Sequence, residues 1–446
     1  MRFANFNTIA KTARRLFTTT VLSFAITGLI PVPSFAQRAA GTAQPTASQT
    51  DMVLDWNDIA VNSIVGIAQQ RPERGMIRLA MVHLAIYDVL NAIAGYPFTP
   101  YTGKLDVVLP ASADAAAATA AHDVLVTLFP NQQTQLDSKY EASLATIPDG
   151  AEKSNGISAG RHSASAILAA RAGDGRDAVV PYTPGSGPGV WVPTPPNFPA
   201  AAGPEVARVQ PWTLKSPSQF RVKPPPDLTG EKWARDYNEV KALGAATSSS
   251  RTPEQTDIGR FWSENTLAQW DRAWRRISMA KGLSMNDNAR FFAVLAAAVS
   301  DAMIACWDSK YTYNFWRPVT AIRAGDTDGN PDTQPDTTWT PLVTTPPHPE
   351  YPSAHGCFTG ATTETLKFLF DTDDVSFSVD STVAGLSNPV HNYSSFSQAL
   401  DEVFGARIYG GMHYRNSMRY GAKIGKKASH YATDHFFLKS KQDGNR

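Results

Sequence analysis

Apolar residues recur at intervals of three and four positions along most of this chain, a spacing that places them on one face of a helix. In the first half, the pattern predicts helices over residues 52–67, 76–93, 113–128 and 157–170. In the second half, it predicts helices over residues 231–243, 253–262, 286–308, 354–370 and 396–436, the last interrupted by Gly410 and Gly411. Strand patterns are few, and the sequence shows no internal repeat. The sequence therefore predicts an all-α fold.

Two segments separate the predicted helices. Thirteen prolines lie between residues 181 and 230. Proline lacks a backbone N–H and clashes with the preceding turn of a helix, so we expect an irregular arm that lies over the fold. Residues 327–345 are rich in Asp, Pro and Thr and predict a loop. On these grounds the chain divides into residues 51–180, the arm at 181–230 and residues 231–446.

The first 36 residues differ in composition from the rest. They carry four basic residues and no acidic residue, an apolar stretch over residues 16–30, and small side chains at Ser34 and Ala36. This pattern is typical of a secretory signal peptide, followed here by a flexible linker over residues 37–50. The apolar stretch is too short to predict a membrane span. We therefore expect an exported protein, periplasmic or secreted, without a membrane span in its mature form.

Charge narrows the range of partners. Four of the 41 Lys and Arg residues lie in the expected signal peptide, which leaves 37 basic against 40 acidic residues. This near-neutral balance predicts no nucleic-acid partner. The sequence leaves the oligomeric state open. It also leaves two interpretations of Cys306 and Cys357, either two small buried residues, which we favour, or a disulfide of an exported protein.

Three short segments in the last third of the chain concentrate groups that bind anions. A multiply charged oxyanion needs several fixed cations, a hydroxyl and backbone N–H groups around it once it leaves water. Two histidines add an acid–base group and a group able to bond the central atom. The residues are Lys310, expected just beyond the helix over 286–308, with Arg317; Ser353 and His355; and Arg407 and His413.

These segments resemble the joint signature of the vanadium-dependent haloperoxidases and the type-2 phosphatidic acid phosphatases, which reads K-x6-R-P, P-S-G-H and S-R-x5-H. Order and spacing both agree. The resemblance implies two four-helix bundles, with the anion site in the C-terminal bundle. The matching positions are Lys310, Arg317 and Pro318, then Pro352, Ser353 and His355, then Arg407 and His413.

Three positions depart from the signature. Ala354 replaces a glycine, Ala406 replaces a serine, and Ser417 stands where many members carry an aspartate four residues after the last histidine. A hydroxyl is a weaker partner for histidine than a carboxylate. How His413 is oriented through its second ring nitrogen is therefore left open.

In this family the anion is vanadate, and the resemblance implies a role for each matching residue. A ring nitrogen of His413 bonds vanadium, and His355 acts as acid and base. Lys310 polarises the bound peroxide. Halide then attacks this peroxide, which gives hypohalous acid. The oxygens of vanadate are bound by Lys310, Arg317, Ser353, the backbone N–H of Ala354, and Arg407.

Two further residues would line the pocket where peroxide and halide meet, Trp307 and His348. In the family a phenylalanine at the position of His348 accompanies chloride oxidation, and a histidine is typical of bromoperoxidases. The resemblance thus implies hydrogen peroxide and bromide or iodide as substrates, with an unidentified organic acceptor.

Two other functions fit the same residues. An exported acid phosphatase would use His413 as the nucleophile toward phosphorus and His355 to protonate the leaving group. A non-enzymatic phosphate or vanadate binder would not need His355. Taken singly, Lys310, Ser353 and Arg407 also fit ordinary roles at helix ends and on helix surfaces.

One more pattern suggests a metal. Asp326, Asp328, Asn330 and Asp332 alternate as at the start of a calcium-binding loop. The glycine stands at the wrong position and no glutamate closes the loop, so the pattern favours a solvated turn over a calcium site.

Overall fold

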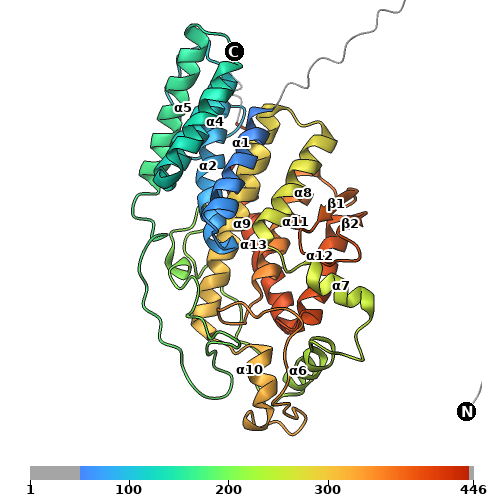
Figure 1. Ribbon diagram of the computed structural model, residues 1–446. Coiled ribbons are helices and arrows are strands. Elements are labelled where there is room, and N and C mark those ends of the chain that lie inside the picture. The colour runs from blue at the N-terminus through green and yellow to red at the C-terminus, as the bar shows by residue number, and fades with distance from the viewer. Residues whose placement is uncertain (1–50, 441–446) are drawn as a thin grey trace, which may run out of the picture. The chain divides into compact units, whose positions relative to one another are not determined.

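A computed structural model describes residues 51–440. The expected signal peptide and linker lie outside the described residues. Helices dominate the described part of the chain (Figure 1), which confirms the all-α prediction. Two short strands within it, β1 (Phe377–Asp380) and β2 (Val390–Tyr393), form an antiparallel pair in which Val379 lies opposite His391.

The helices of the first half include all those that the apolar spacing predicts. α2 begins at its proline because proline fits the first turn of a helix. α4 was not predicted, because Leu136 is its one buried residue and gives no apolar period. The elements are α1 (Met52–Val61) with a π-helical continuation (Asn62–Ile67), α2 (Pro72–Ile93), α3 (Ala113–Leu128), a 3-10 turn (Pro130–Gln132), α4 (Gln133–Ala145) and α5 (Ala151–Ala170).

The helices of the second half add α8 and the short α10 to the predicted set. The buried Leu267, Trp270 and Trp274 of α8 are nevertheless spaced as on a helix. The predicted break at Gly410 and Gly411 separates α12 from α13. The elements are α6 (Glu231–Leu243), α7 (Pro253–Phe261), α8 (Thr266–Lys281), α9 (Met285–Tyr313), α10 (Pro318–Arg323), a 3-10 turn (Gly325–Thr327), α11 (Ala354–Phe370), α12 (Phe396–Tyr409) and α13 (Arg415–His435).

The long helix α9 joins the two groups of helices. It packs against α2 and also against α11 and α13. α2 and α9 are long and apolar enough to cross a membrane, but most of the residues of each are buried inside the protein. α9 ends where Asn314 adopts a left-handed conformation, with φ of 48°. Lys310 therefore lies inside the last turn of the helix, and the expectation that it follows the helix end is wrong.

The proline-rich arm is fixed to α9 by a buried carboxylate. Asp301 accepts hydrogen bonds from the backbone N–H of Trp212 and of Thr213, both at 2.7 Å, and from the Thr213 hydroxyl at 2.6 Å. Nearer its start, the arm donates the N–H of Ala202 to the carbonyl of Pro347 at 2.7 Å. Since Pro347 lies just before the second anion-binding segment, the arm reaches the candidate site.

α11 and α13 approach each other closely because glycines face each other between them. A Cβ atom at Gly421 of α13 would lie 2.4 Å from the carbonyl oxygen of Ser353, and one at Gly425 would lie 2.4 Å from that of Cys357. Both distances are far shorter than packed atoms tolerate. The glycines thus allow α13 to lie directly against the turn that carries Ser353.

Replacing Gly421 by alanine is expected to push α13 away from this turn. Overpacking of this kind lowers the free energy of unfolding by about 1 to 3 kcal/mol. Denaturant unfolding measures the change, and Lys423→Ala, on the exposed side of the same helix, is the matched control. A Gly421→Ala protein as stable as the control would contradict the packing described.

Candidate active site

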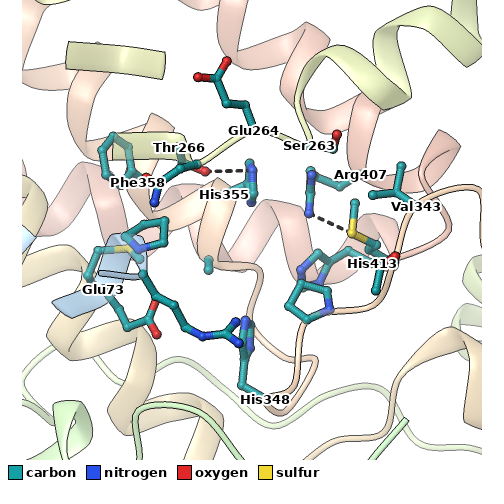
Figure 2. Close-up of a pocket in the computed structure, with 18 of the residues that line it drawn as sticks. Glu73, Ser263, Glu264, Thr266, Val343, His348, His355, Phe358, Arg407 and His413 are labelled. Carbon is teal, nitrogen blue, oxygen red and sulfur yellow. Dashed lines mark hydrogen bonds between the residues drawn. The ribbon is translucent and has the colours of Figure 1, made fainter. Parts of the chain in front are cut away.

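A cavity of about 210 Å³ is lined by residues of the second and third anion-binding segments (Figure 2). Lys310, Arg317 and Ser353 are fully buried and do not line it, but Arg317 contacts the lining residues His348 and His413. The predicted site residues that line the cavity are Trp307, His348, Ala354, His355, Arg407 and His413.

Lys310 is held by two backbone carbonyls of the second segment. Its Nζ donates to the oxygens of Pro349 at 2.8 Å and of Glu350 at 3.0 Å. An ammonium group carries three protons, so one donor remains for a further acceptor. Burial lowers the pKa of Lys310 to about 8, which means that its charge is poorly compensated.

Arg317 connects the second and third segments. Its Nε donates to the carbonyl of His348 at 2.9 Å, and its Nη1 donates to the carbonyl of Met412 at 3.0 Å. Nη1 also lies 3.2 Å from Nε2 of His413, and Nη2 lies 3.0 Å from Nδ1 of His348. The planar guanidinium is thereby fixed in direction. Burial lowers its pKa to about 10.

Arg407, from α12, is the third buried cation. Its Nη1 donates to the carbonyl of Trp262 at 2.6 Å, and its Nη2 lies 3.1 Å from the sulfur of Met412. Its Nε has no hydrogen-bond partner within residues 51–440. Burial, and then the charge of Arg317, lowers the pKa of Arg407 to about 9. The two arginines thus repel each other, and an anion between them would relieve this repulsion.

His413 is oriented by Glu350, a residue absent from the sequence-based prediction. The ring Nδ1 lies 2.8 Å from Oε1 of Glu350, which also accepts the backbone N–H of Tyr414 at 3.1 Å. Ser417 donates its hydroxyl to Oε2 at 2.6 Å. With Nδ1–H donated to the carboxylate, Nε2 keeps its lone pair beside Arg317. Ser417 therefore holds the carboxylate, and the carboxylate holds the histidine.

His355 has a neutral partner instead. Its Nε2 lies 2.9 Å from the hydroxyl of Thr266, at the start of α8 (Figure 2). Burial, followed by the charge of Arg407, lowers the pKa of His355 well below its ordinary value. The ring is therefore neutral and able to accept a proton.

Ser353 and Ala354 form the start of α11. Ser353 is the N-cap residue, and its hydroxyl accepts the N–H of Gly356 at 3.5 Å. Its own N–H donates to the carbonyl of Ser417 at 3.1 Å. The first N–H groups of a helix have no partner within it and attract anions. Ala354 lines the cavity at this point, so the helix start faces the candidate site.

Trp307 and His348 lie together on the cavity wall. Their ring centroids are 5.0 Å apart. Burial, and then the charges of Lys310 and Arg317, lowers the pKa of His348 well below its ordinary value. In this structure His348 is therefore a neutral ring that accepts a hydrogen bond from Arg317.

Two residues of the candidate site were missed by the sequence-based prediction. Glu350 stands between a proline and a tyrosine in the second segment, and an acid three residues before Ser353 was a usable signal. Thr266 gave no signal, because it precedes His355 by 89 residues and only the packing of α8 brings the two together.

Two other sequence patterns have structural explanations. Cys306 and Cys357 are buried free thiols, as we favoured. Asp328 accepts hydrogen bonds from Nε1 of Trp233 and from the hydroxyl of Thr333, each at 2.7 Å. The central carboxylate of the acidic loop thus stabilises the loop itself.

Comparison with known proteins agrees with this geometry. The family model described as the VCPO second helical-bundle domain matches residues 290–440, which include most of α9 and all of α10 to α13. The resemblance to the vanadium haloperoxidases is confirmed. The vanadium chloroperoxidase of Curvularia inaequalis is 26% identical over 417 residues, covering 74% of this chain and 67% of that protein.

Solved structures of vanadium haloperoxidases share the fold. A bacterial vanadium-dependent iodoperoxidase has a TM-score of 0.74 at 24% identity, covering 88% of this chain and 98% of its own. The holo form of a bacterial vanadium-dependent chloroperoxidase has a TM-score of 0.64 at 18% identity, covering 82% of this chain and 92% of its own. The likeness therefore extends well beyond the matched C-terminal segment.

Removing the Glu350 carboxylate is expected to release His413. In Glu350→Ala, both Nδ1 of His413 and the hydroxyl of Ser417 lose their partner, and the affinity for orthovanadate should fall by about 10- to 100-fold. Equilibrium dialysis measures this affinity. Ser417→Ala removes only one hydrogen bond from the carboxylate and should cost less. Wild-type affinity in Glu350→Ala would show that His413 is held by other contacts.

Proposed function

We propose that this protein is an exported, vanadate-dependent haloperoxidase that oxidises bromide or iodide with hydrogen peroxide to hypohalous acid. The observation that carries the proposal is the charge around His413. Three buried cations, Lys310, Arg317 and Arg407, surround a site where the described residues place one buried carboxylate, that of Glu350, against them.

The donor set fits a bound oxyanion. Burial lowers the pKa of each cation, and buried charge without a partner is costly. A multiply charged anion in the cavity would compensate all three. The unpartnered Nε of Arg407 and the remaining proton of Lys310 are suitable donors for it. Vanadate is favoured by the relatives, whose names are vanadium chloroperoxidase and vanadium-dependent iodoperoxidase.

The residues then divide into those that bind and those that move protons. Bound vanadate supplies a Lewis-acid centre that activates hydrogen peroxide toward halide. His413 would present Nε2 to vanadium, because Glu350 takes its other ring nitrogen. The neutral ring of His355 would accept a proton from hydrogen peroxide and hold it for return. The oxygens of the anion would be bound by Lys310, Arg317, Ser353, the N–H of Ala354, and Arg407.

A phosphatase would use the same shell, since phosphate and vanadate share shape and charge. One experiment separates the two functions. The purified chain is loaded with orthovanadate and assayed for bromination with peroxide, and the vanadate-free chain is assayed for phosphate ester hydrolysis. We expect peroxide-dependent bromination that millimolar phosphate suppresses during loading. Phosphatase turnover without any bromination would replace the proposed function by its alternative.

Alanine substitutions of the two histidines are expected to affect different properties, vanadate retention for His413 and turnover for His355. His413→Ala should abolish tight vanadate retention, because it removes the protein bond to vanadium. His355→Ala should retain vanadate but lose turnover by roughly 100- to 10,000-fold, the usual contribution of an acid–base group. Vanadium content after dialysis and bromination rates provide the two measurements. His162→Ala, exposed on α5, is the control, and equal vanadate loss in both site variants would refute the roles assigned.

Halide choice is expected to depend on His348. The relatives include both chloroperoxidases and an iodoperoxidase, so their names do not decide it. We expect bromide and iodide oxidation with little chloride turnover. A phenyl ring cannot accept the hydrogen bond from Arg317, so His348→Phe should raise the chloride-to-bromide ratio by about tenfold, or roughly 1.4 kcal/mol. Identical halide profiles across pH in the two proteins would exclude His348 from this role.

A further inference from the structure

The cavity has an apolar wall that anion binding and halide oxidation do not require. Its volume is about 210 Å³, and a cavity of roughly 150 Å³ already holds benzene. A bound anion would occupy the part of this volume beside His413 and Arg407. Cavities with an apolar wall and a few polar groups are typical of sites for organic ligands. The apolar wall consists of Pro72, Met303, Trp307, Val343, Pro346 and Phe358.

Glu73 is a buried carboxyl of this lining that halide oxidation does not use. It lies in the first turn of α2 and is 3% exposed. Its Oε1 has no hydrogen-bond partner in the described part of the chain. The adjacent Arg74 is paired with Glu205 at 2.6 Å, and Arg71, which also lines the cavity, is exposed. Burial outweighs the charges of Arg71 and Arg74 and raises the pKa of Glu73 above its ordinary value, which favours the neutral form that can donate a hydrogen bond.

The proline-rich arm holds this carboxyl in place. A Cβ atom at Gly203 would lie 2.6 Å from Nε1 of Trp307 and 3.5 Å from Cγ of Glu73, so the three residues are packed together. Figure 2 shows Glu73 and Phe358 on one side of the pocket and His413 on the other. A ligand beside Glu73 would therefore occupy the space next to the anion site.

We propose that this cavity binds the organic acceptor, and that the acceptor is a phenol whose hydroxyl is hydrogen-bonded to Glu73 while its ring lies against the apolar wall. A carboxyl and a phenol hydroxyl satisfy each other without burying a charge. A hydrocarbon would leave Oε1 unpaired, and an ammonium group would need a new buried ion pair. The inference rests on the proposed function, because halide oxidation supplies the halogen.

The overall reaction balances. A phenol, bromide, hydrogen peroxide and one proton give a bromophenol and two molecules of water. Bromide gives up two electrons and peroxide takes them. Bromine then bonds to a ring carbon, the C–H bond at that carbon breaks, and its proton leaves with the hydroxide of hypobromous acid as water. With the ring held in the cavity, bromination occurs before hypobromous acid diffuses into solvent.

The test uses the full chain loaded with orthovanadate and phenol itself as the probe. Calorimetric titration without halide or peroxide measures phenol binding independently of activity. Glu73→Leu keeps the apolar bulk but removes the hydrogen bond, so the affinity should fall roughly 2- to 10-fold. Glu73→Gln still donates from its amide and should stay within about twofold of wild type. Glu254→Gln, an exposed acid of another cavity, is the matched control and should equal wild type.

Three results would overturn the proposal: no saturable phenol binding to wild type, wild-type affinity in Glu73→Leu, or equal losses in Glu73→Leu and Glu254→Gln. Iodide oxidation by wild type without phenol separates this failure from that of the proposed function. If iodide is oxidised but phenol does not bind, only the acceptor site is wrong. If iodide is not oxidised, the proposed function is wrong and the acceptor role falls with it.

Discussion

The site depends on burying three like charges around one imidazole. Lys310, Arg317 and Arg407 repel one another, and a single carboxylate does not neutralise them. The fold compensates with backbone carbonyls, which turn inward to accept hydrogen bonds from the cations. These carbonyls belong to Trp262, His348, Pro349, Glu350 and Met412. The paths of the loops at the site are thus set by the cations that the loops must hold.

Much of this could be predicted from the sequence. Apolar spacing locates the long helices, because their buried faces are continuous, and the spacing of charged residues within the three segments locates the anion site. Contacts between distant elements could not be predicted in the same way. Thr266 reaches His355 only because α8 packs beside α11, and the polar α4 has too little buried surface to produce a period. Lys310 was misplaced by a few residues, because α9 continues until Asn314 ends it.

Glu350 shows why a missing motif residue need not mean a missing interaction. The signature leads one to expect a carboxylate at the position of Ser417, one turn after His413. Here the carboxylate comes from the loop before α11, and Ser417 donates a hydroxyl to it. His413 therefore has a carboxylate partner although Ser417 departs from the signature.

The seam between the two groups of helices runs through the site. The segment matched by the family model, residues 290–440, supplies the cations and both histidines. Thr266, which contacts His355, and Trp262, which holds Arg407, come from earlier in the chain, as does Glu73 on the cavity wall. The matched segment alone therefore does not complete the site. Recombination that joined residues 290–440 to a foreign preceding chain would preserve every signature residue but would lose the contacts of Thr266 and Trp262 and the cavity wall at Glu73.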